Sequence, residues 1–164
     1  MNMFILDNDP VKAAQLNCDA HCSKIILEIA QCLSTNFNLQ GVEAPYKTSH
    51  QNHPVTKWMR ESRANFNWTV KHGIALWEEK LYRTGKGHKS VEVIQWAKQN
   101  SNLLKFEKHE QTPFAVAIAD TMLCRKDPSF DLDKPVDCYK LYYKHDKRHL
   151  GKWKNRPVPE WFNL

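Results

Sequence analysis

The hydrophobic pattern is helical along most of the chain, and it is clearest between residues 19 and 34. Apolar side chains recur there at steps of three and four residues, which is the spacing of one buried face of an amphipathic helix. This stripe consists of Cys22, Ile25, Ile26, Ile29 and Leu33. A polar stripe beside it consists of His21, Lys24, Glu28 and Gln31. The pattern predicts a helix, capped by Asp19, that carries a polar seam next to its buried face.

The same spacing predicts the other elements. A helix is expected from Pro10, because Asp9 can cap it and proline suits the first helical position. Gly73 is expected to kink or divide the longest helix. The remaining predicted helices cover residues 54–83, 89–99, 114–120 and 135–150, and the segment 35–52 is expected to be a loop. No stretch alternates with period two, so we predict an all-α fold, mostly helical and compact, with long irregular loops.

Composition sets the class of protein. The 164 residues are 41% hydrophobic and include six tryptophans, which favours a single folded domain over residues 1–164. The basic and aromatic tail, residues 151–164, is expected to pack on the body. No apolar run is long enough to span a membrane, and residues 1–6 lack the basic flank of a secretory signal, so we expect a cytoplasmic monomer.

The five cysteines are odd in number, which favours reduced thiols. Cys18, His21 and Cys22 lie close together in sequence, but no spacing supplies a fourth ligand. We therefore predict no metal site and no cofactor.

The net charge of +6 indicates a polyanionic partner such as double-stranded DNA. Seven of the bases lie between Lys140 and Arg156, against the single acid Asp146. Tyrosines and tryptophans are interleaved with these bases, as in surfaces that stack on bases while they hold phosphates. The candidate DNA-binding residues are His21, Gln31, Arg60, Arg63, Lys140, Tyr143, Lys144, Lys152 and Lys154.

The polar seam of residues 21–31 has two interpretations. In the first, Lys24 and Glu28 form a solvated ion pair one helical turn apart, which contributes only about 0.3–0.5 kcal/mol. In the second, Glu28 is a catalytic carboxylate beside an apolar flank, with a basic nitrogen one turn away.

Three motifs occur in the order seen in a known family. Asp19-Ala-His21 is followed seven residues later by Glu28, then come Thr112-Pro113 and the aromatic-lysine segment 139–144. Together they resemble the bacteriophage pyrimidine-dimer DNA glycosylases of the endonuclease V type. The resemblance implies a small helical, metal-free enzyme that removes a base from a cyclobutane dimer. In that family an N-terminal α-amine attacks sugar C1′, a glutamate moves protons, and β-elimination cuts the strand.

Carried over, the resemblance makes Glu28 the catalytic carboxylate. Asn2 is too large to favour removal of the initiator methionine, so the attacking amine would be that of Met1. A free α-amine titrates near pH 8, which leaves a useful neutral fraction. Lys24 offers a second route to an imine, and water activated by Asp7 or Asp9 offers a third. In the family, arginines lie one residue before and three residues after the catalytic glutamate. This chain has Leu27 and Gln31 at those positions, so its recognition of damaged DNA is expected to differ.

The resemblance, together with the basic and aromatic tail, therefore implies a DNA-repair enzyme of viral type. It would be a DNA glycosylase, with or without AP-lyase activity, that extrudes a pyrimidine dimer or another damaged or modified base from duplex DNA. One alternative is a non-catalytic nucleic-acid-binding protein of a virus or mobile element. Another is an enzyme for a nucleotide or small phosphorylated ligand, with His50, His53 and Glu28 at the pocket. A viral origin would place the protein in the host cytoplasm.

Overall fold

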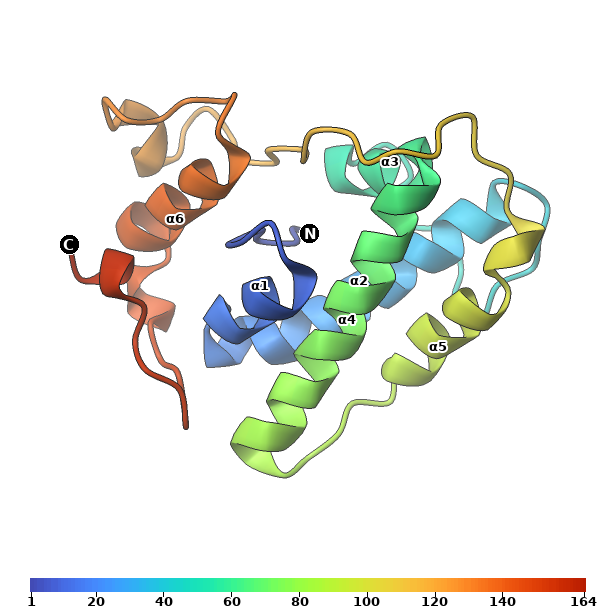
Figure 1. Cartoon of the computed structure of the whole chain (residues 1–164), viewed down its shortest axis with the longest axis horizontal. Helices are drawn as coiled ribbons and strands as arrows, with labels where there is room; N and C mark the ends of the chain where they lie inside the picture. The colour runs from blue at the N-terminus through green and yellow to red at the C-terminus, as the bar shows by residue number, and fades with distance from the viewer.

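The computed structural model describes all 164 residues, and its regular structure is entirely helical (Figure 1). The six α-helices are α1 (Pro10–Leu16), α2 (Asp19–Asn38), α3 (Pro54–Glu61), α4 (Arg63–Thr84), α5 (Val91–Gln99) and α6 (Pro135–Asp146). Four short 3₁₀ turns lie between α5 and α6 or after α6, at Ser101–Leu103, Leu123–Lys126, Arg148–Leu150 and Glu160–Phe162. This confirms the all-α prediction. No helix combines the length and apolar character needed to cross a membrane.

Helix α2 lies at the centre of the core and packs against α3, α4 and α5. Its predicted apolar stripe is fully buried, with Ile25, Ile26, Ile29 and Leu33 all 0% exposed. The helix begins at Asp19, but the cap position is Cys18, which makes no side-chain capping bond. It extends four residues beyond Ser34, so the following loop starts at Leu39.

The long predicted helix is divided at Ser62, and the prediction of a break at Gly73 is wrong. Ser62 has an extended backbone, and its hydroxyl accepts the N–H of Asn65, so it ends α3 and caps α4. Gly73 lies within continuous α4, where a Cβ would be only 2.8 Å from Ile94 Cδ1. The glycine is therefore a close-packing position between α4 and α5.

The predicted helix over residues 114–120 is also wrong, because this segment runs extended between the two halves of the molecule. Its backbone groups find partners outside helical structure. The Tyr139 hydroxyl accepts from Ala117 N and donates to Ala115 O, and the Asn2 side-chain amide donates to Ala117 O. These bonds replace the i to i−4 ladder that a helix would have supplied.

Residues 1–6 lie in the middle of the molecule in Figure 1, between α6 and the α2–α4 pair. The Phe4 ring stacks on His21 at 3.9 Å between centroids and contacts the rings of Tyr139, Tyr142 and Tyr143. Phe4 has a φ of +44°, which is uncommon for a bulky residue. Packing of the ring against these four side chains holds the backbone in this conformation.

Helix α6 ends at Asp146, before the predicted end at Leu150, and the tail then lies along the body. Trp153 Nε1 donates to Leu16 O, and Lys154 N donates to the Asp19 carboxylate. Arg156 reaches the buried Glu79 of α4 at 2.6 Å. These contacts join the C-terminal segment to α1, α2 and α4.

Candidate functional site

The first residue and Glu28 meet at one cavity. The Met1 nitrogen lies 3.9 Å from Glu28 Oε1, and Asn2 N donates to Glu28 Oε2 at 3.3 Å. No other positive group lies within 4.0 Å of this carboxylate. Lys24 therefore does not form the predicted ion pair with Glu28. Both of the acid's contacts are long, so its oxygens are only loosely held.

The cavity at Glu28 has a volume of about 210 Å³. Its walls come from the N-terminal segment, α2, α6 and the extended segment 117–119. The lining residues are Met1, Asn2, Phe4, Lys24, Glu28, Ala117, Ala119, Tyr142 and Lys147. The Glu28 side chain is 12% exposed, so it is recessed but open to this space. Three predicted catalytic residues, Met1, Lys24 and Glu28, are thus brought together.

Met1 is held by its side chain and open at its backbone. The side chain is 1% exposed and packs against the core, whereas the residue as a whole is half-buried. Asn2 fixes the next position, because its amide donates to Ala117 O and its side-chain oxygen accepts Met3 N. In a chain that starts at Met1, this arrangement points an α-amine at the Glu28 carboxylate.

The surroundings of the cavity are positively charged. Burial is the largest cause that lowers the pKa of His21 to about 3, and the charges of Lys147, Lys24 and His149 lower it further. Lys147 Nζ also lies 5.2 Å from the centre of the Tyr142 ring. Cations from α2 and from the end of α6 therefore converge on one side of the molecule, where an anionic ligand would be stabilised.

His53 approaches the same place from α3. Its Nδ1 accepts the N–H of Val55, which leaves the proton of the neutral ring on Nε2. Burial, followed by the charge of the chain terminus, lowers the pKa of His53. The ring is therefore neutral near pH 7 and adds no charge beside the Met1 amine.

Two predicted DNA-binding residues lie in the core, which corrects that expectation. His21 is 3% exposed and Tyr143 is 1% exposed. His21 Nδ1 lies 2.6 Å from the Tyr143 hydroxyl, and this hydroxyl also accepts Cys18 N. The pair joins α2 to α6 and presents no surface to a duplex. The motif residue Asp19 is likewise structural, since it binds Arg83 and the tail.

The predicted arginines are occupied within the fold. Arg60 donates to Asn36 Oδ1 and to Gln51 O, and so holds the loop that precedes α3. Arg63 donates to Leu104 O and lies over the Phe106 ring. Both bonds tie segments of this chain together, and neither side chain lines the cavity at Glu28.

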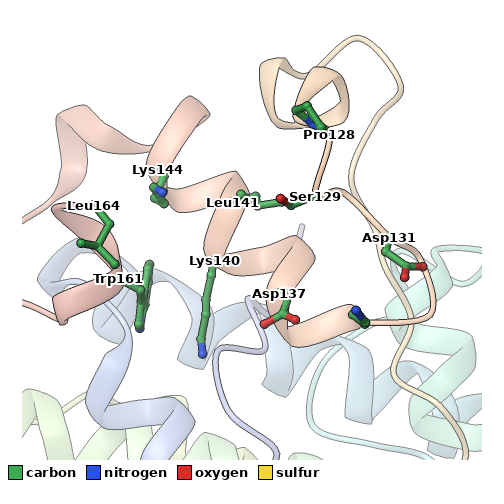
Figure 2. Close-up of a pocket in the computed structure, with 10 residues that line it drawn as sticks. Pro128, Ser129, Asp131, Asp137, Lys140, Leu141, Lys144, Trp161 and Leu164 are labelled. Carbon is green, nitrogen blue, oxygen red and sulfur yellow. The ribbon is translucent and has the colours of Figure 1, made fainter.

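Lys140 and Lys144 lie at a separate cavity of about 460 Å³ on the outer side of α6 (Figure 2). Lys140 lies beside Trp161, with Nζ 5.9 Å from the ring centre. Asp131 and Asp137 line the same space, so its charge is mixed. Lys152 and Lys154 are exposed on the tail. Gln31 lines a third cavity, beside Leu27.

The thiols are unsuited to nucleophilic chemistry. All five cysteines are free and buried. Burial is the largest cause that raises the pKa of Cys32 to about 11, and the charges of Glu28 and the chain terminus also act on this thiol. Burial raises the pKa of Cys22 to about 12. Both thiols stay protonated at neutral pH, and only the thiolate is a strong nucleophile.

Sequence reasoning did not single out Asn2 or Lys147 as neighbours of the Met1 amine. It placed His53 with His50 and Glu28 at a pocket only in the small-ligand alternative, and neither histidine lines the cavity at Glu28. Lys147 belongs to the basic segment found in the sequence, but nothing in that pattern separates it from Lys140 or Lys144. No known protein family, curated protein or solved structure with which the chain was compared matches it significantly.

Proposed function

We propose that this chain is a DNA glycosylase with AP-lyase activity, acting on a pyrimidine dimer or another damaged or modified base in duplex DNA. The observation that supports it best is the 3.9 Å separation of the Met1 nitrogen and the Glu28 carboxylate at a cavity wall. The resemblance of the sequence motifs to the pyrimidine-dimer glycosylases suggests the same two groups. A reacting group and its proton acceptor need to lie within about one hydrogen bond or one bridging water.

In the proposed reaction the neutral Met1 amine forms a bond to sugar C1′ as the bond from C1′ to the base breaks. Glu28 accepts a proton from the attacking nitrogen and returns it to the departing base. The ring oxygen then leaves C1′ and takes up a proton, which gives a protonated imine. Loss of a C2′ proton expels the 3′ phosphate and cuts the strand. Water finally releases the sugar and restores the amine.

The positive groups around the cavity support an anionic substrate. Lys24 and Lys147 line the cavity beside Glu28, where they can contact the phosphates on either side of an extruded nucleotide. The cavity volume of about 210 Å³ suits one base or sugar rather than a base pair. The target nucleotide would therefore have to leave the helix to reach the carboxylate.

The proposal is tested by trapping the imine. The protein is incubated with abasic and ultraviolet-irradiated duplexes in the presence of borohydride, and the adduct is mapped by mass spectrometry. We expect base release, strand cleavage, and DNA attached to the peptide that begins at Met1. An additional residue placed before Met1 should abolish the adduct, whereas the matched variant Lys24→Ala should retain it. Intact mass identifies the first residue of the purified protein.

Two results would contradict the proposal in different ways. An adduct on Lys24 would overturn the role of the Met1 amine but leave the glycosylase intact. No adduct, no base release and no cleavage on abasic, irradiated or modified-base duplexes would overturn the enzyme. Tight binding to DNA without any of these would instead support the non-catalytic alternative.

A further inference from the structure

Leu27 is an exposed apolar residue of α2, whereas the other large apolar residues of this helix are buried. Its exposed fraction is 40%, and no other large apolar residue within α2 is exposed. Leu27 directly precedes Glu28 and lies one turn after Lys24. It is therefore on the ridge of α2 that borders the cavity at Glu28. Nine large apolar residues of the chain are exposed, and Leu27 is the one that directly precedes the candidate catalytic acid.

A second cavity lies on the other side of this ridge. Its volume is about 460 Å³, and it is lined by Leu27, Gln31, Tyr46, Lys47, Thr48 and Ser49. The segment 46–49 is tied down, because Thr35 Oγ1 accepts Ser49 N and donates to Ser49 O, and the Tyr46 hydroxyl bonds Ser90. Leu27 is thus a partly exposed apolar side chain at the edge of the second cavity, while the next residue, Glu28, lines the first cavity.

Cations stand on both sides of Leu27. Lys24 lines the cavity at Glu28, and Lys47 lines the second cavity. Both lysines are exposed. An apolar tip between two cations matches the surface of a DNA strand, in which apolar base faces lie between charged phosphates.

We propose that Leu27 is a wedge that enters the base stack of duplex DNA and fills the space left when the target nucleotide moves to Glu28. This inference rests on the proposed function. Glu28 is recessed, so a stacked base cannot reach it, and the vacated step has to be filled or remain unstacked. Apolar side chains that insert between base steps offset part of an unstacking cost of a few kcal/mol. Leu27 is the exposed apolar side chain adjacent to the carboxylate in the chain.

The test compares paired and pre-opened substrates. Leu27→Ala should slow base release about 10- to 100-fold on a fully paired duplex, since it removes part of the help in extrusion. On a duplex whose target nucleotide is unpaired, the change should be less than about 3-fold, because extrusion there costs little. Leu27→Met should restore most of the rate. Leu39→Ala is the matched control, since Leu39 is 41% exposed and directly follows the far end of the same helix.

A second measurement follows extrusion without turnover. In a Glu28→Gln background, 2-aminopurine placed next to the target should brighten when the wild-type ridge unstacks it, and Leu27→Ala should reduce the change. Equal slowing of Leu27→Ala on paired and unpaired substrates, or no slowing on either, would overturn the wedge while base release by the wild type upholds the proposed function. A wild-type protein inert on both duplexes overturns the two together.

Discussion

Two glutamates of this molecule have largely buried side chains but differ in their partners. Glu79 on α4 has a side chain 6% exposed, and Glu28 on α2 has one 12% exposed. Arg83 Nε donates to Glu79 Oε2 at 3.0 Å, and Arg156 Nη2 donates to Oε1 at 2.6 Å. Glu28 has only the Met1 nitrogen at 3.9 Å and Asn2 N at 3.3 Å.

The difference shows how the fold assigns roles to two acids of the same type. Short bonds to two guanidinium groups offset the desolvation of Glu79 and leave it no capacity for another ligand. Glu28 faces a cavity, and its two contacts, to the Met1 and Asn2 nitrogens, are long, so its oxygens keep capacity for another ligand. One acid closes a network that joins α2, α4 and the tail, and the other is available for chemistry.

The sharpest test of this comparison is Glu28→Gln. We expect base release and strand cleavage to fall by about 10²- to 10⁴-fold, the usual contribution of a positioned acid or base. The free energy of unfolding should change by less than about 1 kcal/mol, since the contacts of Glu28 are long. Rates are measured under single-turnover conditions and stability by urea denaturation. A large loss of stability with little loss of rate would reverse the roles of the two glutamates.

Glu79→Gln should have the opposite profile. The substitution leaves the buried Arg83, whose side chain is 1% exposed, without one of its two carboxylate partners, and it also unpairs Arg156, so unfolding should become easier by about 3 kcal/mol. Single-turnover rates should be nearly unchanged at temperatures where the variant is folded. Glu78→Gln is the matched control, because Glu78 is the adjacent residue and is exposed. Equal stability of the two variants would contradict a structural role for Glu79.

Most helices were predictable because their signals are local. Asp9 and Pro10 mark the start of α1, and the three- and four-residue spacing in α2 gives its buried face. The segment 114–120 misled because its apolar composition suits a helix, while its backbone partners are Tyr139 and Asn2, distant in sequence. The break at Ser62 depends similarly on the pairing of this residue with Lys108.

The site was predictable only in part. Spacing within α2 and the family resemblance pointed to Glu28, Lys24 and Met1, and the fold brings these three to one cavity. Their catalytic roles stay predictions. The basic segment indicated a polyanion, but only tertiary packing separates Lys147, which lines this cavity, from Lys140, which lines another. His21 is polar in sequence yet buried, because its bond to Tyr143 satisfies the ring.

Acid should destabilise the fold through its buried neutral histidines. The pKa of His21 is lowered to about 3 by burial and then by nearby lysines, and that of His72 is lowered to about 4, chiefly by burial. Unfolded histidine titrates near pH 6.5, so between about pH 6.5 and 4 the unfolded chain binds more protons than the native one. The free energy of unfolding should therefore decrease as the pH is lowered, by up to about 1.4 kcal/mol per pH unit for each of these two histidines.

The measurement is urea denaturation at a series of pH values. His72→Leu should reduce the slope of unfolding free energy against pH by the contribution of one histidine, up to about 1.4 kcal/mol per pH unit. This reduction is expected whatever the effect of the substitution on stability at neutral pH. His109→Gln is the matched control, because His109 is exposed. An unchanged slope in His72→Leu would show that this histidine is protonated in the native state. The Glu79 network contributes no histidine, so the part of the slope that His72→Leu removes reports on the core at α4.

The smallest expected effect concerns the cations that Glu28, unlike Glu79, leaves unpaired. Lys147 lines the cavity and makes no ion pair within the chain, so it can bind a phosphate of the substrate. In a Glu28→Gln background, Lys147→Ala should weaken binding to duplex DNA about 3- to 10-fold at low salt. The slope of log affinity against log salt should also fall by about 0.9, the value for one phosphate contact. Lys98→Ala on α5 is the control, since Lys98 does not line this cavity. If Lys147→Ala and Lys98→Ala both show the parent's salt slope, Lys147 makes no phosphate contact. The difference between Glu28 and Glu79 then lies only in the geometry of their partners, and no unpaired cation near Glu28 contributes to DNA binding.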